Sequence, residues 1–238
     1  MPMTSDPAQT SPGLTRGHKK RARTQLALIE AAMRLYARKD IGSLTMNEFA
    51  EEAGLANGTV YNYFRSREEV LEAVGIHFAT QLSEHILRLT EEVSDGARRL
   101  VTGLRVYIQR ARQEEDWAQA VVRVIQLDPG LRSTLALYVG NDLKIGREQG
   151  LFDYADLDTA VDCVCSFGLA AIRSSIEGRA VPGNDELVAE MVLKSLGLSA
   201  ERARHYATLP LPVLAGPEEA VVPAPRRRGR PPKRLQAS

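Results

Sequence analysis

Apolar residues recur every three or four positions in the first part of the chain, the spacing that places them on one face of an α-helix. The first such stretch begins near residue 22 and stops near Gly42, and its apolar positions are Leu26, Ile29, Ala32, Met33 and Tyr36. This pattern predicts an amphipathic helix with one face buried against a core.

Capping sequences locate the next helix starts. Thr45 and Glu48 form a capping box, in which the hydroxyl accepts a hydrogen bond from a backbone amide and the carboxylate accepts one in return. A second box begins at Ser66. The first box opens a short helix that ends at Gly54, and another short helix follows directly. Short helices joined by a glycine turn predict a helix-turn-helix unit over residues 45–64.

Longer helical periods fill the rest of the chain. One long helix starts after Ser66 and continues towards Val93, and turns that contain glycine or proline separate the helices that follow it. These are expected at residues 97–113, 115–127, 131–149, 156–179 and 185–198. The predicted fold class is all-α, with a three-helix N-terminal head and a larger helical domain.

The last two predicted helices carry broad apolar faces and small residues that permit close helix approach. On the first they are Ala160, Val161, Val164, Phe167, Gly168, Ala171 and Ile172, and on the second Leu187, Val188, Met191, Val192 and Leu196. We expect these faces to form a four-helix interface in a symmetric homodimer.

The second short helix of the helix-turn-helix has two different sides. At about 100° per residue, Asn57, Gly58, Tyr61 and Asn62 share one side, while Val60 lies opposite, as does Phe64 beyond it. Asn pairs a donor and an acceptor in the way that matches adenine in a major groove. The polar side therefore predicts contact with base edges. A plain surface turn is the alternative for such a short segment.

The order of these elements resembles the TetR family of bacterial transcriptional regulators. The resemblance covers about residues 22–82 and is densest over residues 44–55, 58–64 and 66–71. It implies a repressor that binds a palindromic operator as a dimer and that a small-molecule effector releases. An activator of the same fold is one alternative, and an architectural protein that coats A·T-rich DNA is the other.

The resemblance also implies roles for individual residues. Expected base contacts are Asn47, Asn57, Gly58, Thr59 and Asn62, and expected phosphate contacts are Thr45, Tyr61, Tyr63 and Arg67. The chain departs from the family at Ala56, where a Ser or Thr usually caps the recognition helix. Loss of a cap costs on the order of 1 kcal/mol, so this helix is expected to fray.

Charge and proline divide the chain further. The formal net charge of +1 hides two basic ends on an acidic middle, and prolines gather in residues 1–12 and 210–232. We expect a disordered basic arm at 1–21, the DNA-binding head at 22–82, a domain for effector binding and dimerisation at 83–205, and a proline-rich linker with a basic tail at 206–238. Accessory DNA contacts are expected from Arg21, Arg23, Arg228, Arg230 and Lys233.

The basic tail supports two interpretations. Residues 226–234 hold six cations and no acid around a Gly-Arg-Pro core. This core resembles an AT-hook, which lies extended in a narrow A·T minor groove. A bare charge tail that adds only nonspecific affinity is the other interpretation.

Candidates for an effector pocket combine aromatic and polar groups: Tyr107, Trp117, Arg123, Gln126, Tyr138, Asp142 and Phe167.

No catalytic motif, cofactor fingerprint or metal-ligand spacing is found, so we expect neither an enzyme nor a cofactor or metal. The two cysteines, Cys163 and Cys165, point apart on a helix and suit a reducing cytoplasm. No membrane contact is expected, since no stretch approaches about 18 apolar residues.

Overall fold

The computed structural model describes residues 16–212, and within them the chain forms ten α-helices and one 3₁₀ helix. The elements are α1 (Arg16–Arg38), η1 (Ile41–Ser43), α2 (Met46–Ala53), α3 (Asn57–Tyr61), α4 (Arg67–Thr90), α5 (Gly96–Gln113), α6 (Glu115–Leu127), α7 (Pro129–Glu148), α8 (Leu157–Ile176), α9 (Asn184–Ser195) and α10 (Ala200–Thr208). The predicted all-α fold class is confirmed. The tail with Arg228, Arg230 and Lys233 lies outside the described residues.

Two parts of the predicted helix pattern need correction. Helix α1 begins at Arg16, so residues 16–21 of the expected disordered arm are helical. Their Lys and Arg residues are good helix formers, which periodicity of apolar positions does not reveal. Helix α10 was not expected, because only two small residues, Ala203 and Ala207, are buried on it. Its start is marked by Ser199, whose side chain accepts a hydrogen bond from the amide of Arg202.

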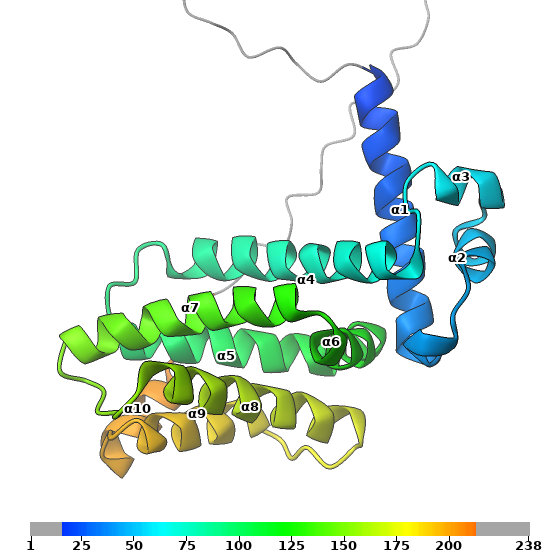
Figure 1. The fold of residues 1–238 in the computed structure, drawn as a ribbon. Helices are drawn as coiled ribbons and strands as arrows, with labels where there is room; N and C mark the ends of the chain where they lie inside the picture. Colours follow the sequence, from blue (N-terminus) through cyan, green and yellow to red (C-terminus); the bar gives the residue numbers. More distant parts are fainter. Residues whose placement is uncertain (1–15, 213–238) are drawn as a thin grey trace, which may run out of the picture.

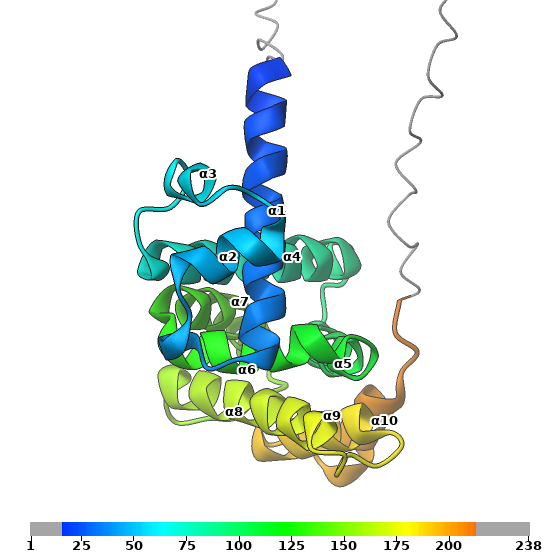
Figure 2. The same ribbon diagram turned by 90° about the vertical axis from the view of Figure 1, so that its right-hand side faces the viewer.

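The helices form a head and a layered body (Figure 1). Helices α1 to α3 make the head, and α4 leads from the head along the top of the body. One core unites the head, α4 and α6, while a second core lies among α5 and α7–α10. Figure 2 shows the first turns of α1 projecting beyond the rest of the molecule.

The head is joined to the body more extensively than the expected boundary near residue 82 implies. Helix α6 packs directly against α1, and the Arg123 guanidinium donates hydrogen bonds to the carbonyls of Tyr36 (2.9 Å) and Lys39 (2.6 Å). These carbonyls belong to the last turn of α1 and the residue after it, which lack partners within the helix. Arg123 therefore caps α1 from the body.

A buried ion pair joins α5 to α9 in the second core. The Arg105 Nε donates to Asp185 Oδ2 at 3.0 Å, and these side chains are only 6% and 5% exposed. Arg105 also donates to the Leu209 carbonyl at 2.6 Å and to Glu186 at 3.1 Å, while Gln109 donates to Asp185 at 2.9 Å. The guanidinium thus links α5, the start of α9 and the residue after α10. Its charge is compensated by the Asp185 carboxylate, which is equally buried.

Helix α8 has two different faces, which corrects part of the expected dimer interface. Of the residues named for that interface, Ala160, Val161, Val164, Gly168, Ala171 and Ile172 are buried within the body, as are Val192 of α9 and Leu196 directly after it. The outward side of α8 is lined instead by Thr159, Asp162, Cys163, Ser166, Phe167 and Ala170. Both sides of α8 carry apolar residues, so the sequence pattern cannot separate the core from an outer face.

Helix α8 also has the length and composition of a membrane-spanning helix, contrary to expectation. It has 20 residues, and its most apolar window has a mean hydropathy of 1.3, with 33% of that window buried. The fold accounts for the inward apolar side, because α8 packs on α5, α6, α7 and α9.

Candidate nucleic-acid interface and effector cavity

The helix-turn-helix is held by the capping box expected from the sequence. Glu48 donates its amide to Thr45 Oγ1 at 3.3 Å, and the Thr45 amide donates to Glu48 Oε2 at 2.9 Å. Hydrogen bonds from Lys39 and from Thr45 lower the pKa of Glu48 to about 2, so the carboxylate stays charged at neutral pH. Gly54 closes α2 in the left-handed conformation, with φ of 66°, which glycine adopts without strain.

The two sides of α3 are arranged as the sequence predicted. Val60 and Phe64 are buried in the head core. Asn57, Gly58 and Asn62 are exposed together with Tyr61, which is 52% exposed. A compact helix with a polar outer side, fixed from behind by a packed core, has the form that enters a major groove.

A cationic groove runs between α3 and the projecting part of α1. Lys20, Arg21 and Thr24 of α1 line it together with Thr59, Asn62 and Tyr63 on the other side. The Arg21 guanidinium lies 5.4 Å from the centre of the Tyr63 ring, and Lys19, Lys20 and Arg23 are exposed. Because these residues belong to α1, their backbone is held beside α3. Such an array is suited to binding successive phosphates.

Two of the expected phosphate contacts are already engaged inside the head. Arg67 donates hydrogen bonds to the carbonyls of Gly42 (2.7 Å) and Leu44 (3.0 Å), which fixes the loop before α2. The Thr45 hydroxyl donates to Glu48 at 2.9 Å. Their direct action on phosphates therefore stays a prediction. Asn47 is exposed on α2 and makes only a long contact, 3.4 Å, with Glu51.

The start of α3 lacks a side-chain cap. Ala56 occupies the cap position, and the helix that follows has only five residues. Ala56→Ser is expected to raise the free energy of unfolding by about 0.5–1 kcal/mol, because its hydroxyl would accept a hydrogen bond from an unpaired amide of the first turn. Chemical denaturation measures this gain, and amide exchange at residues 58–61 should slow in parallel. A loss of stability would show that the local backbone cannot accommodate the cap.

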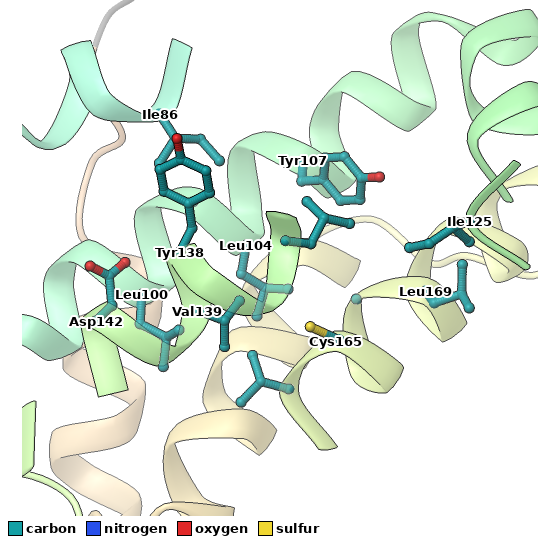
Figure 3. A pocket seen from close by; sticks show the side chains of 14 residues that line it. Ile86, Leu100, Leu104, Tyr107, Ile125, Tyr138, Val139, Asp142, Cys165 and Leu169 are labelled. Carbon is teal, nitrogen blue, oxygen red and sulfur yellow. The ribbon is translucent and has the colours of Figure 1, made fainter. Parts of the chain in front are cut away.

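A largely apolar cavity of about 90 Å³ lies in the body below α4 (Figure 3). Its walls come from α4, α5, α6, α7 and α8: Ile86, Leu100, Gly103, Leu104, Tyr107, Ile125, Leu135, Tyr138, Val139, Asp142, Val164, Cys165, Gly168 and Leu169. Asp142 lies at one end in Figure 3, and Ile125 and Leu169 lie at the other. The cavity is suited to a compact ligand.

Few polar groups reach this cavity, and most of them are neutral. Burial raises the pKa of the Tyr107 hydroxyl, and burial together with the Asp162 carboxylate raises the pKa of the Cys165 thiol to about 11. Burial also raises the pKa of Asp142, against the opposing effect of the hydrogen bond from Arg99. The Tyr107 hydroxyl and the Cys165 thiol therefore keep their protons, and the one carboxylate, Asp142, is paired with a guanidinium.

The structure places only part of the expected effector pocket at this cavity. Tyr107, Tyr138 and Asp142 line it. Trp117 is buried between Phe78, Tyr107 and Arg110, and Arg123 caps α1. Gln126 is exposed on α6, and Phe167 lies on the outer side of α8. These four residues do not line this cavity, because polarity and aromaticity do not show which way a helix faces.

The aliphatic wall was missed for a related reason. Residues such as Leu104, Val139 and Leu169 follow the same period as ordinary core positions. Only Gly103 and Gly168 give a local signal, since glycines inside helices leave room beside the backbone. No group of three or more metal-binding side chains occurs within residues 16–212.

Comparison with known proteins gives matches over both parts of the chain. A family model described as bacterial regulatory proteins, tetR family, matches residues 28–74, and one described as tetracyclin repressor-like, C-terminal domain, matches residues 95–208. The chain is 33% identical over 93 residues to an HTH-type transcriptional regulator of Mycobacterium tuberculosis, covering 38% of this chain and 46% of the relative. It is 30% identical over 122 residues to an HTH-type transcriptional regulator of Bacillus subtilis, covering 51% and 48%.

The chain thus spans about half the length of the curated relatives it matches. Among solved structures it is similar to RolR in complex with the ligand resorcinol, with a TM-score of 0.63 and 28% sequence identity. That match covers 82% of this chain and 97% of RolR. The similarity therefore extends over the head and the body together.

Proposed function

The chain belongs to the TetR family of bacterial regulatory proteins, and on this premise we propose that it is a transcriptional repressor that a small-molecule effector releases from its operator. The exposed polar side of α3 carries the proposal. Asn57 and Asn62 face outward there, beside the cations of α1. Asn47, Thr59 and Gly58 complete the proposed base-reading surface.

We propose that the protein acts as a homodimer through the outer sides of α8 and α9. On α9, Leu187 and Met191 are 50% and 54% exposed, and on α8 Phe167 lies among the small residues Ser166 and Ala170. Small side chains allow two copies of α8 to approach closely. A two-fold axis there would present two α3 helices to half-sites about 34 Å apart on a palindromic operator.

Helix α4 is the physical connection between the cavity and the head. Val70 and Val74 pack into the head core, while Ile86 lines the cavity. In the middle, Gly75 approaches Asp128 so closely that an added Cβ would lie 1.6 Å from its Oδ2. A ligand that shifts α4 would therefore move the head, and the affinities for ligand and DNA would oppose each other by linkage.

The cavity and the similarity to a resorcinol-bound regulator support a small organic effector. The proposed site of action is the bacterial cytoplasm, at the nucleoid when DNA is bound. Activation of transcription is the alternative outcome for the same fold, and a transcription assay on the bound promoter decides between the two.

The proposed function is tested by footprinting the full-length protein on DNA that flanks its own gene. A short protected palindrome supports the repressor, and its release by a compound that raises the melting temperature supports effector control. Protection of A·T-rich DNA without a defined site would instead favour the architectural alternative.

The basic tail is tested by deleting residues 226–238. If it binds A·T minor grooves, the deletion weakens binding most on operators with A·T-rich flanks. Matched operators with G·C-rich flanks are the control, and binding is measured by titration at fixed salt. Equal losses on both would leave only the electrostatic interpretation of the tail.

A further inference from the structure

One charged side chain stands out among the residues that line the cavity. Asp142, on α7, is only 6% exposed, and its neighbours along the wall are mainly aliphatic. Its Oδ1 accepts a hydrogen bond of 2.7 Å from Arg99 Nε. A carboxylate has about four lone-pair sites, so this bond and a further side-chain hydrogen bond with Asn141 leave acceptor capacity for a ligand.

The Arg99–Asp142 pair restricts the charge of any ligand. An anion would lose its hydration on entering the cavity, and the Asp142 carboxylate would repel it. Both effects oppose binding. A cation would gain little, because Arg99 already balances Asp142 at 2.7 Å. An uncharged molecule with a hydrogen-bond donor meets neither obstacle. The volume of about 90 Å³ and the largely apolar walls also restrict the ligand to a compact, mainly apolar molecule.

Arg99 has a second set of contacts that leads out of the cavity. Its Nη1 donates to the carbonyls of Thr90 (2.7 Å) and Val93 (3.3 Å). Thr90 is the last residue of α4, and carbonyls at a helix end have no partner within the helix. One guanidinium therefore joins the carboxylate in the cavity to the end of α4.

Other side chains hold the same corner without lining the cavity. Gln149 donates to the Ser94 carbonyl at 2.7 Å and accepts from the Gly96 amide at 2.9 Å. The Tyr206 hydroxyl donates to Asp95 at 2.7 Å. Among these anchors of the α4–α5 corner, Arg99 is the one bonded to a residue that lines the cavity.

We propose that the effector is an uncharged, compact and mainly apolar molecule whose hydroxyl or N–H group donates to Asp142, and that Arg99 transmits its binding to the end of α4. This rests on the proposed function for the existence of an effector. The ligand's donor competes with Arg99 for the carboxylate, and a guanidinium held less firmly there also holds the carbonyls of Thr90 and Val93 less firmly.

The ligand class is tested with four single-ring probes and the full-length protein in the absence of DNA: phenol, toluene, benzoate and benzylammonium. Calorimetry is expected to show phenol binding at least about tenfold more tightly than toluene, with no binding of either charged probe. Asp142→Leu, which removes the acceptor, should bring the phenol-to-toluene ratio close to one. Equal binding of phenol and toluene by the unmodified protein, tighter binding of a charged probe, or no binding of phenol at millimolar concentration overturns the proposal.

Transmission is tested by amide hydrogen exchange in residues 91–96, again without DNA. Phenol should speed exchange there several-fold in the unmodified protein, and toluene should not. Arg99→Lys keeps the charge but loses the planar guanidinium that bonds three oxygens. In this variant the amides of residues 91–96 should exchange faster even without phenol, and phenol should cause no further increase. Gln149→Ala is the matched control, because it loosens the same corner but leaves Arg99 in place, and phenol should still act.

A phenol effect that persists in Arg99→Lys, or that is absent from the unmodified protein, overturns the role of Arg99. These outcomes are separate from the fate of the proposed function, which stands or falls on operator binding. A protein that binds its operator but fails the probe tests would remain a repressor with a different effector chemistry.

Discussion

Replacing Arg105 with Met is expected to lower the free energy of unfolding by about 3–5 kcal/mol. The substitution leaves the Asp185 carboxylate, only 5% exposed, without its main partner. It also removes the hydrogen bond to the Leu209 carbonyl, which fixes the chain after α10 to α5. Chemical denaturation followed by circular dichroism measures the loss.

Two comparisons show whether the buried charge is the cause. Arg179→Met removes an exposed ion pair with Glu177 and is expected to cost less than about 1 kcal/mol. The double variant Arg105→Met with Asp185→Leu removes both charges and should recover a large part of the stability. A double variant no more stable than Arg105→Met would assign the loss to packing and not to the unpaired carboxylate.

Asn57→Ala is expected to weaken binding to the operator by about 30-fold or more while leaving nonspecific DNA binding nearly unchanged. Loss of a good side-chain contact to a base costs about 1–3 kcal/mol, and a symmetric dimer loses it in both half-sites. Asn57 is exposed at the start of α3 and makes no side-chain cap there, so the fold should not suffer. Titration of operator and random DNA at one salt concentration measures both affinities.

Arg21→Gln provides the contrast. The Arg21 guanidinium lies in the groove between α1 and α3, where we expect it to contact phosphates and not base edges. It should weaken operator and random DNA alike and reduce the salt dependence of binding, because fewer counterions are released. If Asn57→Ala behaves in the same way as Arg21→Gln, then Asn57 contacts the phosphate backbone and not a base.

The sequence predicted the helix-turn-helix well because its signals are local. The capping box at Thr45, the turn at Gly54 and the buried positions Val60 and Phe64 all lie within one short segment, residues 45–64, and each has a direct structural cause. The start of α1 at Arg16 was missed because helix propensity without apolar periodicity leaves no clear pattern. Helix α10 was missed because its buried residues are alanines.

The cavity was much harder to predict, because its lining residues are spread over five successive helices, from Ile86 to Leu169. Tyr138 and Asp142 were identified by their chemistry, but Leu104 and Val139 look like any core residue. The roles of Arg99 and Arg123 depend on carbonyls in other elements, and no spacing along the chain encodes such contacts. The same limit applied to α8, where apolar residues occur on both the inner and the outer side.

The cap that Arg123 places on α1 has a consequence for protein engineering. Regulators of this kind invite the exchange of DNA-binding heads, so that one sensor can control a foreign promoter. Here the carbonyls at the end of α1, in the head, accept hydrogen bonds from Arg123 of α6, in the body. Helix α6 also forms part of the head core. A graft cut between the helix-turn-helix and α4 would separate these partners. A chimera should carry α6 along with the head, or choose a donor whose first helix accepts the same guanidinium.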